Sequence, residues 1–164
     1  MKTSIILLTV LSMTITSFET IERDAEAAAE RMAHHVVTAL QHRSLEEYKA
    51  LFPTLEAVHG IMEYNAGLYA NNLEAAKEDF KIHYVHGALP ELNKSFKSII
   101  ADGVKAGINW SKIKLENVEF SKTGTSIAPA TITFSCEGNE YKLQFERMLF
   151  INGDWKVSQF AELI

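Results

Sequence analysis

Three side chains that can bind a transition metal, Asp79, His83 and His86, follow one another at spacings of four and three residues. In an α-helix this spacing places all three on one face. Two imidazoles and a carboxylate would bind zinc or copper and leave a coordination position open, as catalytic sites do. However, Gly87 follows at once and would fray the last turn, and nearby lysines indicate an ordinary solvated face. We therefore assign no metal ligand and no cofactor, and we keep metal binding as an alternative.

A second group of metal-ligating residue types consists of Glu30, His34, His35 and His42. His35 and His42 share one face of the helix predicted for this region. An amphipathic helix fills its polar side with residues of this kind, so the group is a weaker metal site than the first.

Cofactor-free catalysis would need an acid, imidazole or phenol whose pKa is shifted inside an apolar cavity. The side chains of suitable type near the expected cavity are Tyr48, Asp79, His83, Tyr84 and Glu146. None of them lies in a catalytic motif. Tyrosines that pack with one polar tip and acids that face water explain the same residues, so we name no catalytic residue.

The single cysteine, Cys136, lies in a strand pattern where a small buried apolar residue fits. One cysteine cannot form an internal disulfide. No adjacent basic residue would stabilise a thiolate, so we expect an unreactive, buried thiol.

Aromatic residues of the C-terminal third indicate a possible ligand site. If the predicted sheet curls, Phe134, Phe145 and Trp155 form a concave apolar wall, and we assign ligand binding to these three residues and Tyr84. A small apolar molecule would fit there. Alternatively, helix residues fill the same space and leave a packed core; these are Phe80, Phe96 and Ile100.

Charge and the N-terminus set the expected compartment. Lys2 precedes an almost unbroken apolar run from Ser4 to Ile15, which predicts a signal peptide over residues 1–17. The run is shorter than the roughly 20 residues that span a bilayer, so we expect no stable membrane insertion after its removal, and a secreted or periplasmic chain. The net charge of −5 becomes −6 when Lys2 is lost without any acid. Such a charge disfavours nucleic-acid partners.

Helical spacing governs the first part of residues 18–164, which we expect to form one domain. Apolar residues repeat every three or four positions from Ile21 to Leu40 and predict an amphipathic helix. Ser44 begins a capping box, in which the Glu47 carboxylate is expected to return to the Ser44 N–H, and a short helix starts at Leu45. Thr54 is predicted to cap the next helix after a break at Pro53.

Two further helices are predicted in the middle of the chain. Asn72 is expected to cap the first, which ends at a break at Gly87. Pro90 suits the first turn of the second, and Gly107 suits its left-handed end. The buried stripe of this second helix is predicted to be Leu92, Phe96, Ile99 and Ile100.

From Ile113 onward the apolar period changes from 3.6 to 2, which predicts four antiparallel strands in a meander. Apolar residues of both parities in the first strand predict a bulge near Glu116 or Asn117. Asn152-Gly153 predicts a two-residue turn into a last strand from Trp155 to Phe160. The second strand carries Thr131, Thr133 and Ser135 on its polar face, which would suit a homodimer through the sheet.

Helices followed by a curled antiparallel sheet that ends in Gly-Asp-Trp-Lys-Val resemble the cystatin-like cone, which includes the nuclear transport factor 2 and SnoaL-like families. The segments that carry the likeness are 51–54, 107–113 and 152–155, and they are also similar to a group of small exported bacterial proteins of unknown function. The resemblance implies an α+β cone. Its members include isomerases, dehydratases, transport adaptors and peptidase inhibitors, so it selects no activity.

Taken together, the sequence predicts an exported, non-catalytic binding or interaction module of α+β class. Its expected ligand is a small apolar molecule or a protein partner. The alternatives are a small cofactor-free enzyme, of isomerase or dehydratase type by the resemblance, and a metal-binding protein that uses the Asp79, His83 and His86 face.

Overall fold

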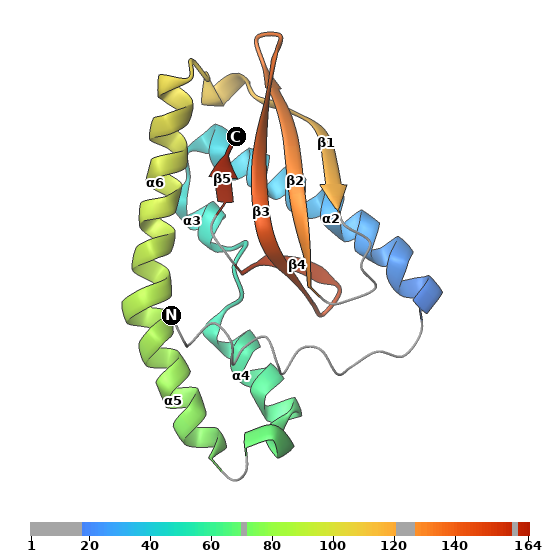
Figure 1. Cartoon of the computed structure of the whole chain (residues 1–164), viewed down its shortest axis with the longest axis vertical. Helices are drawn as coiled ribbons and strands as arrows, with labels where there is room; N and C mark the ends of the chain where they lie inside the picture. The colour runs from blue at the N-terminus through green and yellow to red at the C-terminus, as the bar shows by residue number, and fades with distance from the viewer. Residues whose placement is uncertain (1–17, 70–71, 121–126, 159–160) are drawn as a thin grey trace.

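The computed structural model describes residues 18–69, 72–120, 127–158 and 161–164, with side-chain burial from Ala25 onward. The segment predicted to be a signal peptide, residues 1–17, lies outside the described residues. Within the described chain, helices come first and an antiparallel sheet follows, so the predicted α+β class is confirmed (Figure 1).

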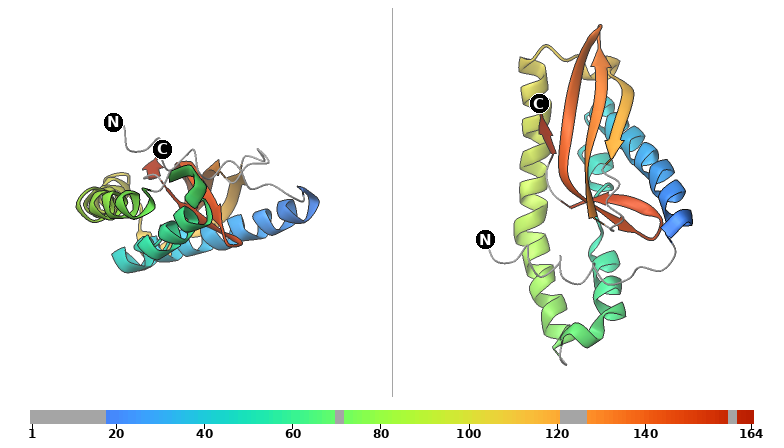
Figure 2. Two further views of the ribbon diagram at one scale, coloured as in Figure 1. Left: turned by 90° about the horizontal axis from the view of Figure 1, so that it is seen from below. Right: turned by 45° about the vertical axis from the view of Figure 1, so that its right-hand side comes forward.

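The predicted first helix is confirmed as α2 (Phe18–His42), which crosses one face of the sheet and contacts β1 (Lys114–Phe120) and β4 (Asp154–Val157) (Figures 1 and 2). Small side chains let the helix approach the strands closely, because they leave little bulk between the two backbones. The alanines that are almost completely buried are Ala28, Ala29, Ala33 and Ala39.

Two of the three predicted helix caps are confirmed by side-chain hydrogen bonds, whereas Asn72 occupies the predicted position before Leu73 but its side chain forms no capping hydrogen bond. Ser44 Oγ accepts a hydrogen bond from Glu47 N (3.2 Å) at the start of α3 (Leu45–Lys49), and Thr54 Oγ1 accepts one from Ala57 N (3.1 Å) at α4 (Leu55–Tyr64). The reciprocal half of the capping box is not formed. Ser44 N donates instead to Ala39 O (2.9 Å), which leaves the Glu47 carboxylate to pair with a histidine of α2.

The break predicted at Gly87 is wrong. The helix α5 (Leu73–His83) continues through the π-helical turn η3 (Tyr84–Ala88) into α6 (Leu89–Lys105). Pro90 has no N–H and would clash with the carbonyl four residues earlier in a regular α-helix. The wider turn, closed by Leu89 N to Tyr84 O, precedes the proline and lets the helix continue.

A helical arm projects beyond the sheet at the bottom of Figure 1. It consists of α4, the 3₁₀ turn η2 (Ala66–Tyr69) and α5. Lys77 of α5 forms an ion pair with Glu63 of α4 (2.7 Å). No residue of α5 is fully buried, and the buried residues of these three elements are Val58 and Met62 of α4.

The helix α6 stands beside the sheet and contacts β5 (Ala161–Leu163) (Figure 2). Of its predicted stripe, Leu92, Phe96 and Ile99 are buried, and Ile100 is partly buried. The helix ends, as predicted, before Gly107, which has a φ of +83°. The 3₁₀ turn η4 (Trp110–Lys112) then leads into the sheet.

The sheet has the order β1-β2-β3-β4 and is antiparallel throughout, with β2 (Ile127–Cys136) and β3 (Asn139–Ile151) at its centre. The bulge predicted in the first strand is confirmed by a register shift between Leu115 and Asn117. The turn between β3 and β4 is also confirmed, because Asn152 (φ 52°) and Gly153 (φ 86°) both adopt the positive φ of a two-residue hairpin.

The last strand is predicted to run from Trp155 to Phe160, but β4 ends at Val157, and a fifth strand that is not predicted, β5, begins at Ala161. Both β4 and β5 pair with β3 on the same side, Val157 with Met148 and Ala161 with Phe145. Phe145 and Met148 are three positions apart in β3, whereas their partners Ala161 and Val157 are four positions apart. The chain between β4 and β5 therefore contains one extra residue. Ser158 stabilises this irregularity, since its N and Oγ both donate to Arg147 O (3.2 and 3.1 Å).

Candidate binding groove

The residues predicted to bind a ligand lie in two different parts of the molecule. Phe134 and Phe145 have no exposed surface, and Trp155 is 4% exposed, so all three belong to the core between α2 and the sheet. Tyr84 lies in η3, where its hydroxyl donates to Pro53 O (3.2 Å).

Aromatic contacts hold the three core residues in place. The ring of Phe134 packs between those of Trp110 and Tyr141, with centroids 5.8 and 5.7 Å away. Trp155 packs 4.5 Å from Phe120, and its Nε1 donates to Ala25 O (2.9 Å). These contacts are those of core residues, and ligand binding by these side chains stays a prediction.

The histidines singled out in the sequence are solvent-facing. Asp79 and His83 are paired at 3.5 Å, and both side chains are more than half exposed. His42 pairs with Glu47, while His34 and His35 are exposed. Within the part of the chain that the structure describes, no three His, Cys, Asp or Glu side chains are arranged to hold a metal ion.

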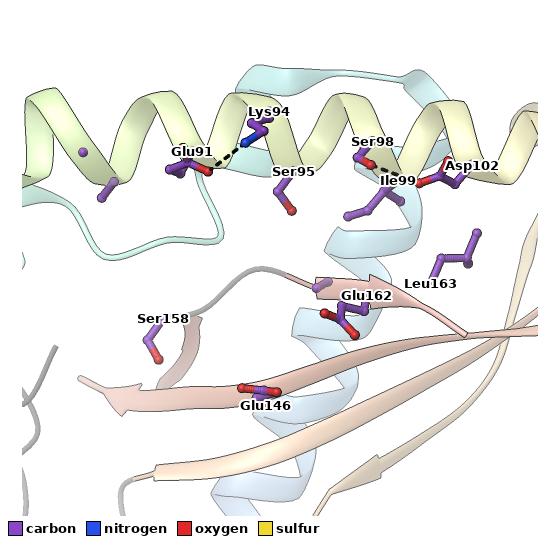
Figure 3. A pocket seen from close by; sticks show the side chains of 13 residues that line it. Glu91, Lys94, Ser95, Ser98, Ile99, Asp102, Glu146, Ser158, Glu162 and Leu163 are labelled. Carbon is purple, nitrogen blue, oxygen red and sulfur yellow. Dashed lines mark hydrogen bonds and ion pairs between the residues drawn. The ribbon is translucent and has the colours of Figure 1, made fainter. Parts of the chain in front are cut away.

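A groove of about 870 Å³ runs between α6 and the strands β3 and β5 (Figure 3). Ser95 points from α6 toward the strands, and Glu146 and Glu162 lie across from it. The volume lies within the roughly 300–1,000 Å³ of typical small-molecule sites. The lining residues are Gly87, Ala88, Glu91, Lys94, Ser95, Ser98, Ile99 and Asp102 from the helical side, and Glu146, Ser158, Ala161, Glu162 and Leu163 from the strand side.

Negative charge predominates in the groove. Its lining contains four carboxylates and one lysine, Lys94, which lies 3.7 Å from the Glu91 carboxylate. Hydrogen bonds from Lys105 (2.8 Å) and Ser98 (3.0 Å) lower the pKa of Asp102, so this side chain stays ionised. Glu146 and Glu162 form no ion pair with any described residue.

Only one of these lining residues, Glu146, is a functional candidate from the sequence, and for a catalytic role; Gly87 and Ile99 enter the predictions only as parts of the fold. A signal for the others is present in the spacing of Glu91, Ser95, Ser98 and Asp102, which repeat every three or four residues. They form a polar stripe on α6 beside its buried stripe. The partner elements of that stripe come from residues more than forty positions away, which the spacing does not reveal.

Tyr48 does not line the groove, but its hydroxyl lies near the backbone of a residue that does. Its side chain is fully buried against the Phe96 ring, 5.0 Å away, and its hydroxyl has no hydrogen-bond partner. Burial raises the pKa of this hydroxyl, and the nearby backbone of Ala161 offsets part of the rise without forming a well-aligned hydrogen bond. Ala161 itself lines the groove.

We expect Tyr48→Phe to raise the free energy of unfolding at pH 7 by about 1 kcal/mol, because it removes an unpaired buried hydroxyl. The native protein should also lose stability above pH 10, since the unfolded chain then ionises a phenol that the folded chain keeps neutral. Tyr48 contributes about 1.4 kcal/mol to this loss at pH 11, and the variant should lack that contribution. Urea unfolding at pH 7 and pH 11 measures both effects.

The control for this experiment is Tyr64→Phe, because Tyr64 is 79% exposed. Tyr64→Phe should leave the difference in free energy of unfolding between pH 7 and pH 11 unchanged. A loss of stability at pH 7 in Tyr48→Phe would contradict the prediction and indicate that the hydroxyl is hydrogen-bonded in solution.

Comparison of the chain with protein-family models, with curated proteins and with solved structures finds no match. Among the helices that the structure describes, none is both long enough and apolar enough to cross a membrane.

Proposed function

We propose that the chain is an exported, non-catalytic binding module and that its ligand occupies the groove between α6 and the β3–β5 strands. The observation that carries the proposal is the groove itself, an 870 Å³ hollow with polar groups on two opposed walls. A helix and a sheet position these groups, and side chains on regular elements hold a ligand more rigidly than side chains on loops.

The chemistry of the lining favours binding over catalysis. A general acid needs a carboxyl group whose pKa is raised toward neutrality. Asp102 shows the opposite shift, because Lys105 and Ser98 stabilise its ionised form. Such a carboxylate attracts positive charge and does not donate a proton at pH 7.

Kinship with the cystatin-like cone remains part of the proposal. Its support is the arrangement of helices before a meandering antiparallel sheet, with α2 across one face. The predicted apolar ligand of that cone is less well supported than a ligand of the groove, because Phe134 and Phe145 have no exposed surface.

A groove-blocking variant tests the proposal. Ser95→Trp places a large ring in the groove, whereas Lys97→Trp places the same ring on an exposed part of α6 that does not line it. Thermal unfolding of the full chain is measured with a panel of amines, sugars, amino acids and fatty acids. We expect at least one compound to raise the melting temperature of the native protein and of Lys97→Trp. The same compound should leave the melting temperature of Ser95→Trp unchanged.

Two outcomes would contradict the proposal. A shift that persists in Ser95→Trp would place the ligand outside the groove. If chromatography shows that the protein converts the bound compound into another compound, the module is an enzyme.

A further inference from the structure

We propose that the helical arm is hinged, so that α4, η2 and α5 rotate as one unit against the rest of the described chain, the body. The joint consists of residues 52–54 and the π-helical turn η3. The inference needs no ligand and goes beyond the binding function proposed above. Its first support is that the buried residues of the arm, Val58 and Met62, do not belong to the hydrophobic cluster that α2, α3, α6 and the sheet share.

The arm is held together by contacts between its own helices, and α4 packs chiefly on α5. Lys77 of α5 forms an ion pair with Glu63 of α4 (2.7 Å). The ring of His59 lies edge-on to that of Phe80, with centroids 6.5 Å apart. The arm projects beyond the sheet in both side views (Figures 1 and 2). A segment with few buried contacts to the core moves at little cost in free energy.

Two connections join the arm to the body, and they lie side by side. The first is residues 52–54, which leave the body at Leu51, where Val157 N donates a hydrogen bond to Leu51 O (2.8 Å). The second is η3, where the Tyr84 hydroxyl donates to Pro53 O (3.2 Å) and so ties the two connections together. Adjacent connections define one axis, and a hinge absorbs its rotation over a few residues.

The continuous helix from α5 to α6 is weakest at η3. Pro90 has no N–H, so the turn before it lacks one helical hydrogen bond. Long helices bend sharply at prolines and at π-helical turns. A Cβ added to Gly87 would meet nothing within 4 Å, so no neighbour packs against the joint there. Gly87 and Ala88 also line the groove, and rotation of the arm therefore changes one end of it.

Distances between pairs of spin labels, measured by pulsed electron resonance on the full chain, test the hinge. The labels attach to introduced cysteines at exposed positions, because Cys136 is buried. Leu68→Cys/Glu119→Cys joins the arm to the body, whereas Glu56→Cys/Leu68→Cys lies within the arm and Lys97→Cys/Glu119→Cys within the body. We expect the distance distribution of the arm–body pair to be at least about twice as wide as those of the two control pairs.

A second variant locates the joint. Tyr84→Phe removes the hydrogen bond between the two connections and should widen the arm–body distribution further. The matched control is Tyr64→Phe, which removes a hydroxyl from the arm at a side chain that is 79% exposed. It should leave the same distribution unchanged.

Three outcomes would overturn the inference. Equal widths for all three pairs would show that the arm is fixed to the body. A pair within the arm that is as wide as the arm–body pair would show that the helices of the arm separate instead of rotating together. An unchanged distribution in Tyr84→Phe would show that the joint lies elsewhere. None of these results bears on ligand binding in the groove, which Ser95→Trp tests separately.

Discussion

Gly103→Ala is expected to lower the free energy of unfolding by about 3 kcal/mol, the upper part of the range for overpacked cores. A Cβ built on Gly103 would lie 2.0 Å from Cζ2 of Trp110. The indole cannot move away easily. It is completely buried, and its Nε1 donates to Ile100 O (3.0 Å) on the same helix.

The matched control is Gly60→Ala in α4, where an added Cβ meets nothing within 4 Å. This change should raise stability by about 0.5–1 kcal/mol, because alanine loses less conformational entropy in a helix. Urea unfolding, followed by circular dichroism and tryptophan fluorescence, measures both variants. A cost below about 1 kcal/mol for Gly103→Ala would show that the indole has room to move, contrary to the packing described here.

Trp155→Ala is expected to lower the free energy of unfolding by about 4 kcal/mol, as for other large-to-small changes of buried aromatic residues. The indole packs against Phe120 and Phe150 and joins β4 to α2 through the hydrogen bond to Ala25 O. Trp155→Phe should cost about half as much, because it keeps an aromatic ring but leaves the carbonyl unpaired.

This second prediction also separates two interpretations of the aromatic residues. Truncation of a core residue lowers the stability of the protein. Truncation of a residue that lines an open ligand pocket lowers the affinity for the ligand and changes the stability little. Thermal and urea unfolding of Trp155→Ala without ligand distinguishes them, and a cost below about 1 kcal/mol would favour the pocket.

Local features of the fold could be predicted because they depend on near neighbours in the chain. The Ser44 and Thr54 caps, the left-handed Gly107 and the Asn152-Gly153 turn each need only residue types a few positions apart. The break predicted at Gly87 failed for a physical reason. Glycine permits a break without requiring one, and a π-helical turn accommodates the following proline.

The groove could not be predicted in the same way. Its helical wall is encoded as a polar stripe on α6, and its strand side depends on how β5 pairs with β3. That pairing includes one extra residue near Ser158, which no alternation of polar and apolar residues reveals. The distance between α6 and the strands is set by buried side chains from several elements.

The sequence alone determined the α+β class, the change from helical to strand period near Trp110, most helix ends and the bulge in β1. Spacing, capping and turn geometry specify these features over a few residues. Only the tertiary structure decided that Phe134, Phe145 and Trp155 are core and that α6 stands beside β5 with four carboxylates in the lining between them. Burial and proximity depend on packing between elements far apart in the chain, and periodicity does not encode the position of one element relative to another.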